Sequence, residues 1–341
     1  MSQKILATHT EDAWLGRDFV ELRVDQVVLA REPNRVLGEA VERGLRRSQV
    51  EVSVAYPPHC IARGPLDVDP RAPHGVHPDA IQLGFLIAQP GAGFATAVHL
   101  ERFGSPARVL LTDEPRLSNA GGASMLTLTA STPQLAEALL AGKVLVRTPS
   151  SIQVSLTGRL RPFVCLRDVS LELLRRGLGE LVRDVDRRTG APVILEFAGP
   201  STRLLSVGDR AVLGDVAARL GAAGVLFPSD EKTEIFLRDQ KRSKAHRVLS
   251  ADAGADFDAQ FSLDLGAIDP LVLDEDGKVR PVRDLDGRAV SQVLLGGDSG
   301  CSLRDLLAAA ALLKSKRVPP RVEFLLAPPS RQTLEVLARS D

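Results

Sequence analysis

The sequence has few cysteines, no excess charge of either sign and no long hydrophobic run. Its three cysteines, Cys60, Cys165 and Cys301, are widely separated among 341 residues, which excludes a disulfide scaffold and indicates a reducing compartment, with the cytoplasm as the default. Lysine plus arginine equals aspartate plus glutamate at 43 each, so no overall field attracts nucleic acid or an anionic membrane. No hydrophobic stretch approaches the ~20 residues that span a bilayer, and residues 1–4 do not begin a secretory signal.

Aromatic residues are also scarce, at 4% of the chain. The single basic run, residues 238–247, contains no aromatic side chain that could stack on a base. We therefore interpret this run as a solvent-exposed segment between domains, and we expect no nucleic-acid partner. The histidine pair His74 and His77 lies among prolines without a regular helix to present both rings, so we interpret it as a surface loop and not a metal site.

The arrangement of apolar segments predicts the fold class. Short apolar runs bounded by turns alternate with longer segments of helical periodicity, which is typical of an α/β fold, and the length predicts two or three domains of ~100–150 residues. The predicted strands are Val20–Val24, Arg108–Leu111, Ile152–Leu156, Val193–Phe197, Gly224–Phe227, Val290–Leu295 and Val322–Ala327. The predicted helices are Arg35–Arg47, Thr132–Ala141, Val169–Arg188, Leu213–Leu220, Ser302–Lys316 and Ser330–Arg339. We expect Asp168 to cap the helix that follows it.

One junction near the end of the chain carries the most information about function. The apolar run that starts at Val293 ends in a glycine-rich turn, and an alanine- and leucine-rich helix follows at once. Such a strand–turn–helix junction directs free backbone N–H groups and a positive helix end at one point, which suits an anion or a cofactor. The predicted substrate- or anion-binding turn consists of Gly296, Gly297, Asp298, Ser299 and Gly300.

This junction resembles the first cluster loop of the aconitase and isopropylmalate-isomerase large-subunit family, which has I-G-S-C-T-N-G-R-L-E-D-L there. Further motifs of that family follow in order along the chain, at Lys4-Ile5-Leu6-Ala7, Gly142-Lys143, Ile152-Gln153-Val154-Ser155-Leu156-Thr157-Gly158, Gly199-Pro200 and Pro228-Ser229-Asp230-Glu231-Lys232-Thr233. The resemblance implies three-layer α/β/α domains around a cleft. It places a first domain at 1–150, a second at 151–249, a connector at 250–287 and a truncated third domain at 288–341.

The resemblance also implies a four-iron, four-sulfur cluster held by three cysteine thiolates. Asp298 stands at the position of the first of those cysteines, and the family's C-x-x-C pair has no counterpart up to residue 341. Cys301 falls within the first turn of the following helix, and Cys165 lies in an apolar segment that we expect to pack in the core. A carboxylate is a poor substitute for sulfur on iron. We therefore expect no cluster and no other metal or cofactor.

The acid–base positions that the resemblance implies are altered as well. The family's D-S-H-T segment corresponds here to Asp113, Glu114 and then a proline and Arg116, so the histidine is missing. The family's N-M-x-x-E becomes a segment that begins with Asp215 and ends with Arg219, where an acid has become a base. The candidate catalytic residues that remain are Asp113, Glu114, Arg116 and Asp215.

These observations lead to three hypotheses. In the first, the chain is a family homologue that has lost the cluster-dependent dehydratase reaction and binds a small carboxylate, or a partner like the family's small subunit, at the old cleft. In the second, it is a cluster-independent lyase or isomerase that acts on a small di- or tricarboxylic hydroxy acid, with Asp298 or Asp113 as the base. In the third, it is a regulatory or complex-forming protein.

Overall fold

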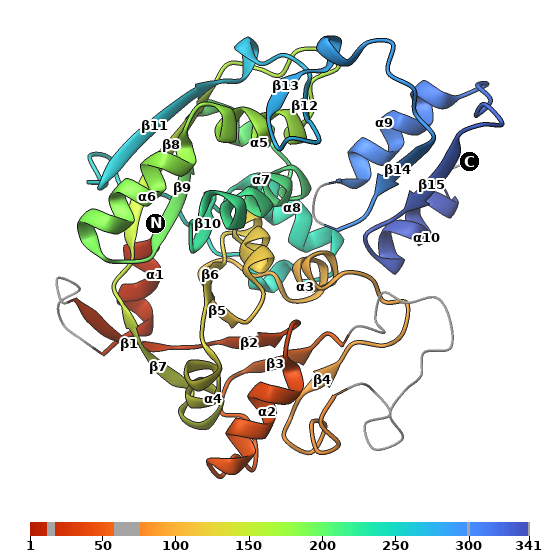
Figure 1. Ribbon diagram of the computed structural model, residues 1–341. Coiled ribbons are helices and arrows are strands. Elements are labelled where there is room, and N and C mark those ends of the chain that lie inside the picture. Colours follow the sequence, from red (N-terminus) through yellow and green to blue (C-terminus); the bar gives the residue numbers. More distant parts are fainter. Residues whose placement is uncertain (12–17, 58–75, 299–300, 340–341) are drawn as a thin grey trace.

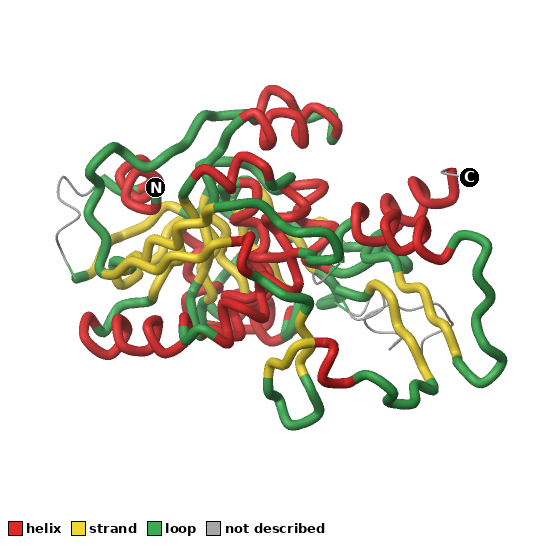
Figure 2. Tube along the Cα trace, turned by 90° about the horizontal axis from the view of Figure 1, so that it is seen from above, coloured by secondary structure: helices red, strands yellow, loops and turns green. Residues whose placement is uncertain are grey.

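The computed structural model describes all of residues 1–341 except 12–17, 58–75, 299–300 and 340–341. The described chain contains two larger parallel sheets and a two-stranded one, with helices packed on them, which confirms the predicted α/β class (Figure 1). Viewed from above, the strands of the main body form a central layer between helices (Figure 2). Within the described residues, no helix is long and apolar enough to cross a membrane.

The first sheet has five parallel strands in the order β4-β3-β2-β5-β6. Its strands are β2 (Gln26–Leu29), β3 (Val52–Ala55), β4 (Leu86–Ile87), β5 (Val109–Thr112) and β6 (Leu126–Thr129). Every residue of β2 and β5 is buried, because the central strands of a parallel sheet are covered on both faces. The helices of this unit are α1 (Ser2–His9), α2 (Pro33–Glu42), α3 (Ala95–Phe103) and α4 (Thr132–Ala141). An antiparallel pair, β1 (Phe19–Arg23) and β7 (Lys143–Arg147), lies beside it.

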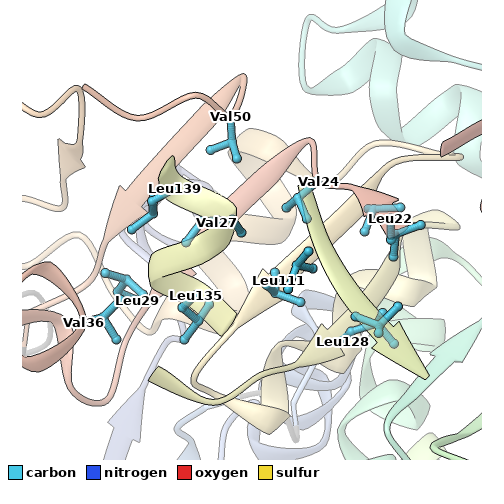
Figure 3. Packing of buried hydrophobic residues seen from close by; sticks show 14 of the residues in the cluster. Leu22, Val24, Val27, Leu29, Val36, Val50, Leu111, Leu128, Leu135 and Leu139 are labelled. Carbon is cyan, nitrogen blue, oxygen red and sulfur yellow. The ribbon is translucent and has the colours of Figure 1, made fainter. Parts of the chain in front are cut away.

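The core of this unit fills the space between β2 and helices α2 and α4. Figure 3 shows Leu135 and Leu139 of α4 beside Val27 and Leu29 of β2, with Val36 of α2 next to them. All five side chains are at most 1% exposed. Each such side chain contributes roughly 1.5–3 kcal/mol through burial, so this cluster holds the helices firmly on the sheet.

The second sheet has four parallel strands in the order β10-β9-β8-β11. Its strands are β8 (Ser150–Thr157), β9 (Val193–Ala198), β10 (Gly224–Leu226) and β11 (Ala259–Asp264). Its helices are α5 (Leu166–Arg175), α6 (Leu178–Thr189), α7 (Val207–Leu220) and α8 (Glu231–Asp239). A hairpin of β12 (Leu271–Leu273) and β13 (Val279–Pro281) packs on α5. Strand β11 comes from the segment that we expected to be a connector.

The third unit is a small α/β element at the C-terminal end, drawn in blue in Figure 1. It consists of β14 (Gln292–Gly296), α9 (Leu303–Leu313), β15 (Glu323–Ala327) and α10 (Arg331–Arg339). The two strands are parallel and pair with each other, as the strand–helix–strand pattern predicts. Ser330 at the start of α10 donates a hydrogen bond of 2.6 Å to Glu101 of α3, which ties this unit to the first one.

Several predicted helix ends were wrong for local reasons. The predicted helix Val169–Arg188 is two helices, because Gly177 adopts a φ of 82° between α5 and α6. Asp168 is not the N-cap of α5; Cys165 holds that position, and Asp168 accepts a hydrogen bond of 2.7 Å from the Cys165 backbone N–H. Cys165 is half-buried and not in the core. The helix predicted to start at Leu213 begins at Val207, where a capping box precedes it.

One arginine of the basic run also differs from our interpretation. Arg242 is half-buried and its guanidinium donates to the carbonyls of Leu100, Glu101 and Gly104 at the C-terminal end of α3, at 3.2, 2.9 and 2.6 Å. A cation at a helix C-terminus satisfies otherwise unpaired carbonyls. This arginine therefore has a structural role. Of the histidine pair, His77 is half-buried, and His74 lies outside the described residues.

Small residues bring the first and second units into close contact. A 3₁₀ helix, η2 (Pro115–Ala123), follows β5 and packs against α7 and β10. A Cβ on Gly214 of α7 would lie 2.6 Å from the Asn119 Cα, and one on Gly121 would lie 1.9 Å from the Val225 carbonyl oxygen. Neither distance is compatible with a side chain at that place. The two glycines therefore set the separation between η2 and α7, both of which carry residues of the site described next.

Candidate anion-binding site

A cavity of about 500 Å³ lies where the three units meet. Its lining residues are Arg31, Arg116, Arg167, Asp215, Ala218, Arg219, Gly296 and Asp298. Arg31 follows β2 and Arg116 belongs to η2, so the first unit supplies two arginines. The second unit supplies the other two arginines from α5 and α7, and the third supplies the turn after β14. Four guanidinium groups therefore surround one cavity.

Helix α7 positions two of these groups on one face. Asp215 and Arg219 are four residues apart, a spacing that places side chains one above the other on a helix. A capping box starts the helix: the Ser206 hydroxyl accepts from the Asp209 backbone N–H at 3.1 Å, and the Asp209 carboxylate accepts from the Ser206 N–H at 3.0 Å. Gly221, at a φ of 79°, ends it. Local capping thus defines the helix, and packing against η2 decides which way this face points.

Glu114 neutralises the two arginines of the first unit. Its carboxylate is 4% exposed and accepts from Arg116 Nε at 3.0 Å, from Arg116 Nη2 at 3.1 Å and from Arg31 Nε at 3.2 Å. Burial raises the pKa of Glu114, but the hydrogen bonds and charges of these guanidinium groups outweigh it and hold the pKa below its usual value. Glu114 is therefore an ionised counter-charge and a poor proton donor.

Asp298 reaches back from the third unit to the same arginine. Its carboxylate accepts from Arg116 Nη1 and from the Thr96 hydroxyl. Burial raises the pKa of this carboxyl, and the nearby charges of Asp215 and Glu114 raise it further, although Thr96 and Arg116 act in the opposite direction. Arg116 thus contacts two carboxylates, one from its own segment and one from the C-terminal unit.

The two arginines of the second unit are much less neutralised. The nearest carboxylate to Arg167 is Asp215, at 3.9 Å between Nη1 and Oδ2, which is too long for a hydrogen bond. Arg219 is exposed and has no ion pair or hydrogen bond with another described residue. Burial lowers the pKa of Arg167, and the positive charge of Arg219 lowers it further. This side of the cavity therefore has positive charge that lacks a close counter-ion.

The structure brings four of the predicted site residues together around one cavity. Arg116, Asp215, Gly296 and Asp298 all line the cavity. Asp113 does not line it, because its carboxylate accepts from the backbone N–H groups of residues 30, 31 and 32 at 2.7, 3.1 and 2.8 Å. It organises the turn before α2. Glu114 does not line the cavity, but it accepts hydrogen bonds from Arg31 and Arg116, which do.

The glycine-rich turn does not offer all of its N–H groups. The Gly297 N–H donates to the Ala327 carbonyl at 2.7 Å, so that group is already satisfied within the third unit. Gly296, at a φ of 109°, has its Cα so close to the same carbonyl that a Cβ would lie 2.1 Å from its oxygen. The predicted residues Ser299 and Gly300 lie outside the described residues.

Arg31, Arg167 and Thr96 were missed as site residues. Arg167 lies 52 residues before Arg219 in the chain, and nothing in the sequence places the two side by side. Arg31 lies in the loop after β2 and Thr96 in the first turn of α3, and neither belongs to a recognisable sequence motif. The only signal in the sequence was the exchange of an acid for Arg219, which indicates a more positive pocket.

The thiols of the described residues do not fit a four-iron cluster. The described residues include two cysteines, Cys165 and Cys301, whereas the cluster that the resemblance implies needs three thiolates. The position aligned with the first cluster cysteine carries Asp298, whose carboxylate is taken up by Arg116 and Thr96. Cys60 lies outside the described residues. In the described part of the chain, no group of three or more potential metal ligands lies together.

Fold and site together define an α/β protein whose parallel-sheet units enclose a cleft rich in arginine. The model of the aconitase family (aconitate hydratase) matches residues 79–280, which is more than half of the chain. The chain belongs to the aconitase family.

Two relatives show which members of the family the chain is similar to. The chain is 28% identical over 342 residues to 3-isopropylmalate dehydratase large subunit 2 of Archaeoglobus fulgidus, covering 97% of this chain and 78% of the relative. It is 27% identical over 346 residues to 3-isopropylmalate dehydratase large subunit 1 of Deinococcus radiodurans, covering 98% of this chain and 75% of the relative. The family resemblance predicted from the motifs is thus confirmed.

Proposed function

We propose that this family member binds a small carboxylate in the arginine-lined cavity and has lost the cluster-dependent dehydration of its relatives. The observation that carries the proposal is the pair Arg167 and Arg219, which line the cavity and of whose ion pairs the described residues provide one, between Arg167 and Asp215 at 3.9 Å. A carboxylate bound there would receive charge-assisted hydrogen bonds, each worth about 1.5–3 kcal/mol. The loss of the cluster is supported by Asp298, because a carboxylate is a poor substitute for sulfur on iron and this one already accepts hydrogen bonds from Arg116 and Thr96.

Thermal unfolding in the presence of added anions tests the binding. We expect at least one of lactate, malate and citrate at millimolar concentration to raise the midpoint, because a ligand that binds only the folded state stabilises it. Arg219→Gln should remove most of the shift, at a cost of about 10- to 100-fold in affinity. Arg183→Gln is the matched control, since Arg183 is an exposed residue of α6 that pairs with Glu180 and should leave the shift intact.

Two results would contradict carboxylate binding. One is the absence of a shift with every carboxylate tested, and the other is a full shift in Arg219→Gln. A larger shift with inorganic phosphate than with any carboxylate would replace the proposed ligand by a phosphate compound.

A turnover assay on the same samples tests the loss of chemistry. We expect no hydration or dehydration of isopropylmalate or citrate after anaerobic incubation with iron and sulfide, and no four-iron absorbance. A stoichiometric chromophore with turnover would refute the proposed loss. Product formed without a chromophore would favour the alternative, a cluster-independent lyase or isomerase.

A protein partner is the second candidate function. The relatives are named as large subunits, and the third unit exposes apolar side chains that a partner could cover. These are Val290, Leu294, Leu307, Leu312, Leu325, Leu326 and Leu334, each at least 40% exposed. We expect co-expression with a small-subunit homologue from the source genome to give a complex in size-exclusion chromatography with light scattering. A monomer at all concentrations would contradict this function.

A further inference from the structure

The charges around the cavity are unevenly balanced, and this asymmetry defines the ligand. Four arginines line the cavity, while three carboxylates, Glu114, Asp215 and Asp298, lie against them. One positive charge is left over when all three are ionised. A ligand with one negative charge would complete the balance, whereas a ligand with two would exceed it.

On the side formed by Arg31 and Arg116, Arg116 is already engaged by two carboxylates of the chain itself. Arg116 donates through Nε and Nη2 to both oxygens of Glu114 and through Nη1 to Asp298. Arg31 donates to Glu114 as well. The Thr96 hydroxyl fixes the Asp298 carboxylate from its other oxygen. Asp298 therefore occupies the place on Arg116 that a second ligand carboxylate would need.

The opposite side, formed by Arg167 and Arg219, is where the carboxylate of a ligand can bind. Both arginines line the cavity; Arg167 has one ion-pair partner, Asp215, at 3.9 Å, and Arg219 has none among the described residues, so a bound carboxylate would supply a counter-charge to both. Asp215 and Asp298 also line the cavity, and ionised carboxylates are hydrogen-bond acceptors only. The part of the ligand next to its carboxylate must therefore present a hydrogen-bond donor.

We infer that the cavity selects a monocarboxylate with an adjacent hydroxyl or ammonium group, and that Asp298 excludes dicarboxylates by acting as an internal second carboxylate. This inference rests on the proposed carboxylate binding. The ligand carboxylate lies between Arg167 and Arg219, and its donor group reaches Asp298 or Asp215. A second carboxylate meets Asp298 at like charge and finds Arg116 already occupied.

Calorimetric titration with three matched probes tests the selection. Lactate carries one carboxylate and a hydroxyl, malate adds a second carboxylate, and propionate lacks the hydroxyl. We expect the wild-type chain to bind lactate at least about tenfold more tightly than either of the others, the equivalent of ~1.4 kcal/mol. Asp298→Asn keeps the shape and an acceptor for Thr96 but removes the charge, so malate should become the tighter ligand of the pair.

Glu180→Gln is the matched control for Asp298→Asn. Glu180→Gln removes an exposed carboxylate on α6 that pairs with Arg183, and it should keep the wild-type order of affinities. If Asp298→Asn does not fold, as judged by circular dichroism, Asp298→Ser takes its place. Malate binding as tightly as lactate in the wild type, or an unchanged malate-to-lactate ratio in the variant, would overturn this inference while the carboxylate site stands. No binding of any probe to either protein would overturn the carboxylate site itself.

Discussion

Gly214→Ala is the sharpest test of how the site is positioned. In the interior of an ordinary helix, alanine is favoured over glycine by about 0.8–1 kcal/mol. In α7, however, the new Cβ would lie 2.6 Å from the Asn119 Cα and 3.3 Å from the Ser118 carbonyl oxygen. Both contacts are with backbone atoms, so no change of side-chain rotamer can relieve them. We therefore assume a packing cost at or above the upper end of the usual ~1–3 kcal/mol. We expect a net loss of about 2 kcal/mol.

Gly38→Ala is the matched control. Gly38 lies inside α2, and a Cβ there would meet no atom within 4 Å. The same substitution should therefore stabilise the chain by about 0.5–1 kcal/mol. The two variants differ in the sign of their effect, because one Cβ enters solvent or empty space and the other enters the contact between two units.

Urea unfolding followed by far-ultraviolet circular dichroism measures both effects. The midpoint should fall for Gly214→Ala and rise for Gly38→Ala, with the slope unchanged. Because α7 carries Asp215 and Arg219, the first variant should also weaken carboxylate binding, and the second should not. A rise in the midpoint for Gly214→Ala would show that the units are not in the close contact described here, and the reasoning about the site would fail with it.

Three further predictions concern buried groups. His99 is fully buried and burial lowers its pKa to about 3, so from pH 7 to pH 5 the unfolded chain takes up a proton that the folded chain cannot, at a cost of about 2 kcal/mol. His99→Gln should lose less stability over this range in urea unfolding, and an equal loss would contradict the lowered pKa. Because the raised pKa values of about 11 and about 12 keep Cys165 and Cys301 protonated at pH 8, we expect both to react with iodoacetamide far more slowly in the native chain than in urea, as measured by peptide mass spectrometry; equal rates would refute this. Asp230 caps α8 and pairs with the fully buried Arg210 at 2.6 Å, so Asp230→Ala should cost about 3–5 kcal/mol and Asp230→Asn, which keeps the capping oxygen, should cost less; a change below about 0.5 kcal/mol on unfolding would contradict the pairing.

Much of the secondary structure was predictable because its determinants are local. Helix Thr132–Ala141 was predicted to the residue, since Ser131 and Gln134 form a capping box at its start and Gly142 ends it at a φ of 73°. The break at Gly177 was missed because apolar periodicity continues through it, and an isolated glycine in a helical pattern is often tolerated. Asp168 was misplaced by three residues because Asp serves both as an N-cap and as the third residue of a capping box.

The candidate site was predictable only in part. Motif order placed the cleft near Asp298, Arg116 and Asp215, and the structure brings these residues to one cavity. Asp113 could not be separated from them by sequence, because adjacent residues after a strand differ in direction and only the backbone N–H groups of residues 30–32 reveal that it is already engaged. Arg31 and Thr96 carry no sequence signal at all.

The sequence by itself determined the α/β class and the family, and it predicted the exchange of a cluster cysteine for Asp298, because strand and helix periodicity, capping and motif order are properties of neighbouring residues. Only the tertiary structure decided what that exchange means. Asp298 meets Arg116 and Thr96, which lie 182 and 202 residues away, while Arg167 has Asp215 at 3.9 Å and Arg219 has no ion pair in the described chain. Such pairings depend on how closely three folded units approach one another, and glycine contacts between backbone segments control that approach.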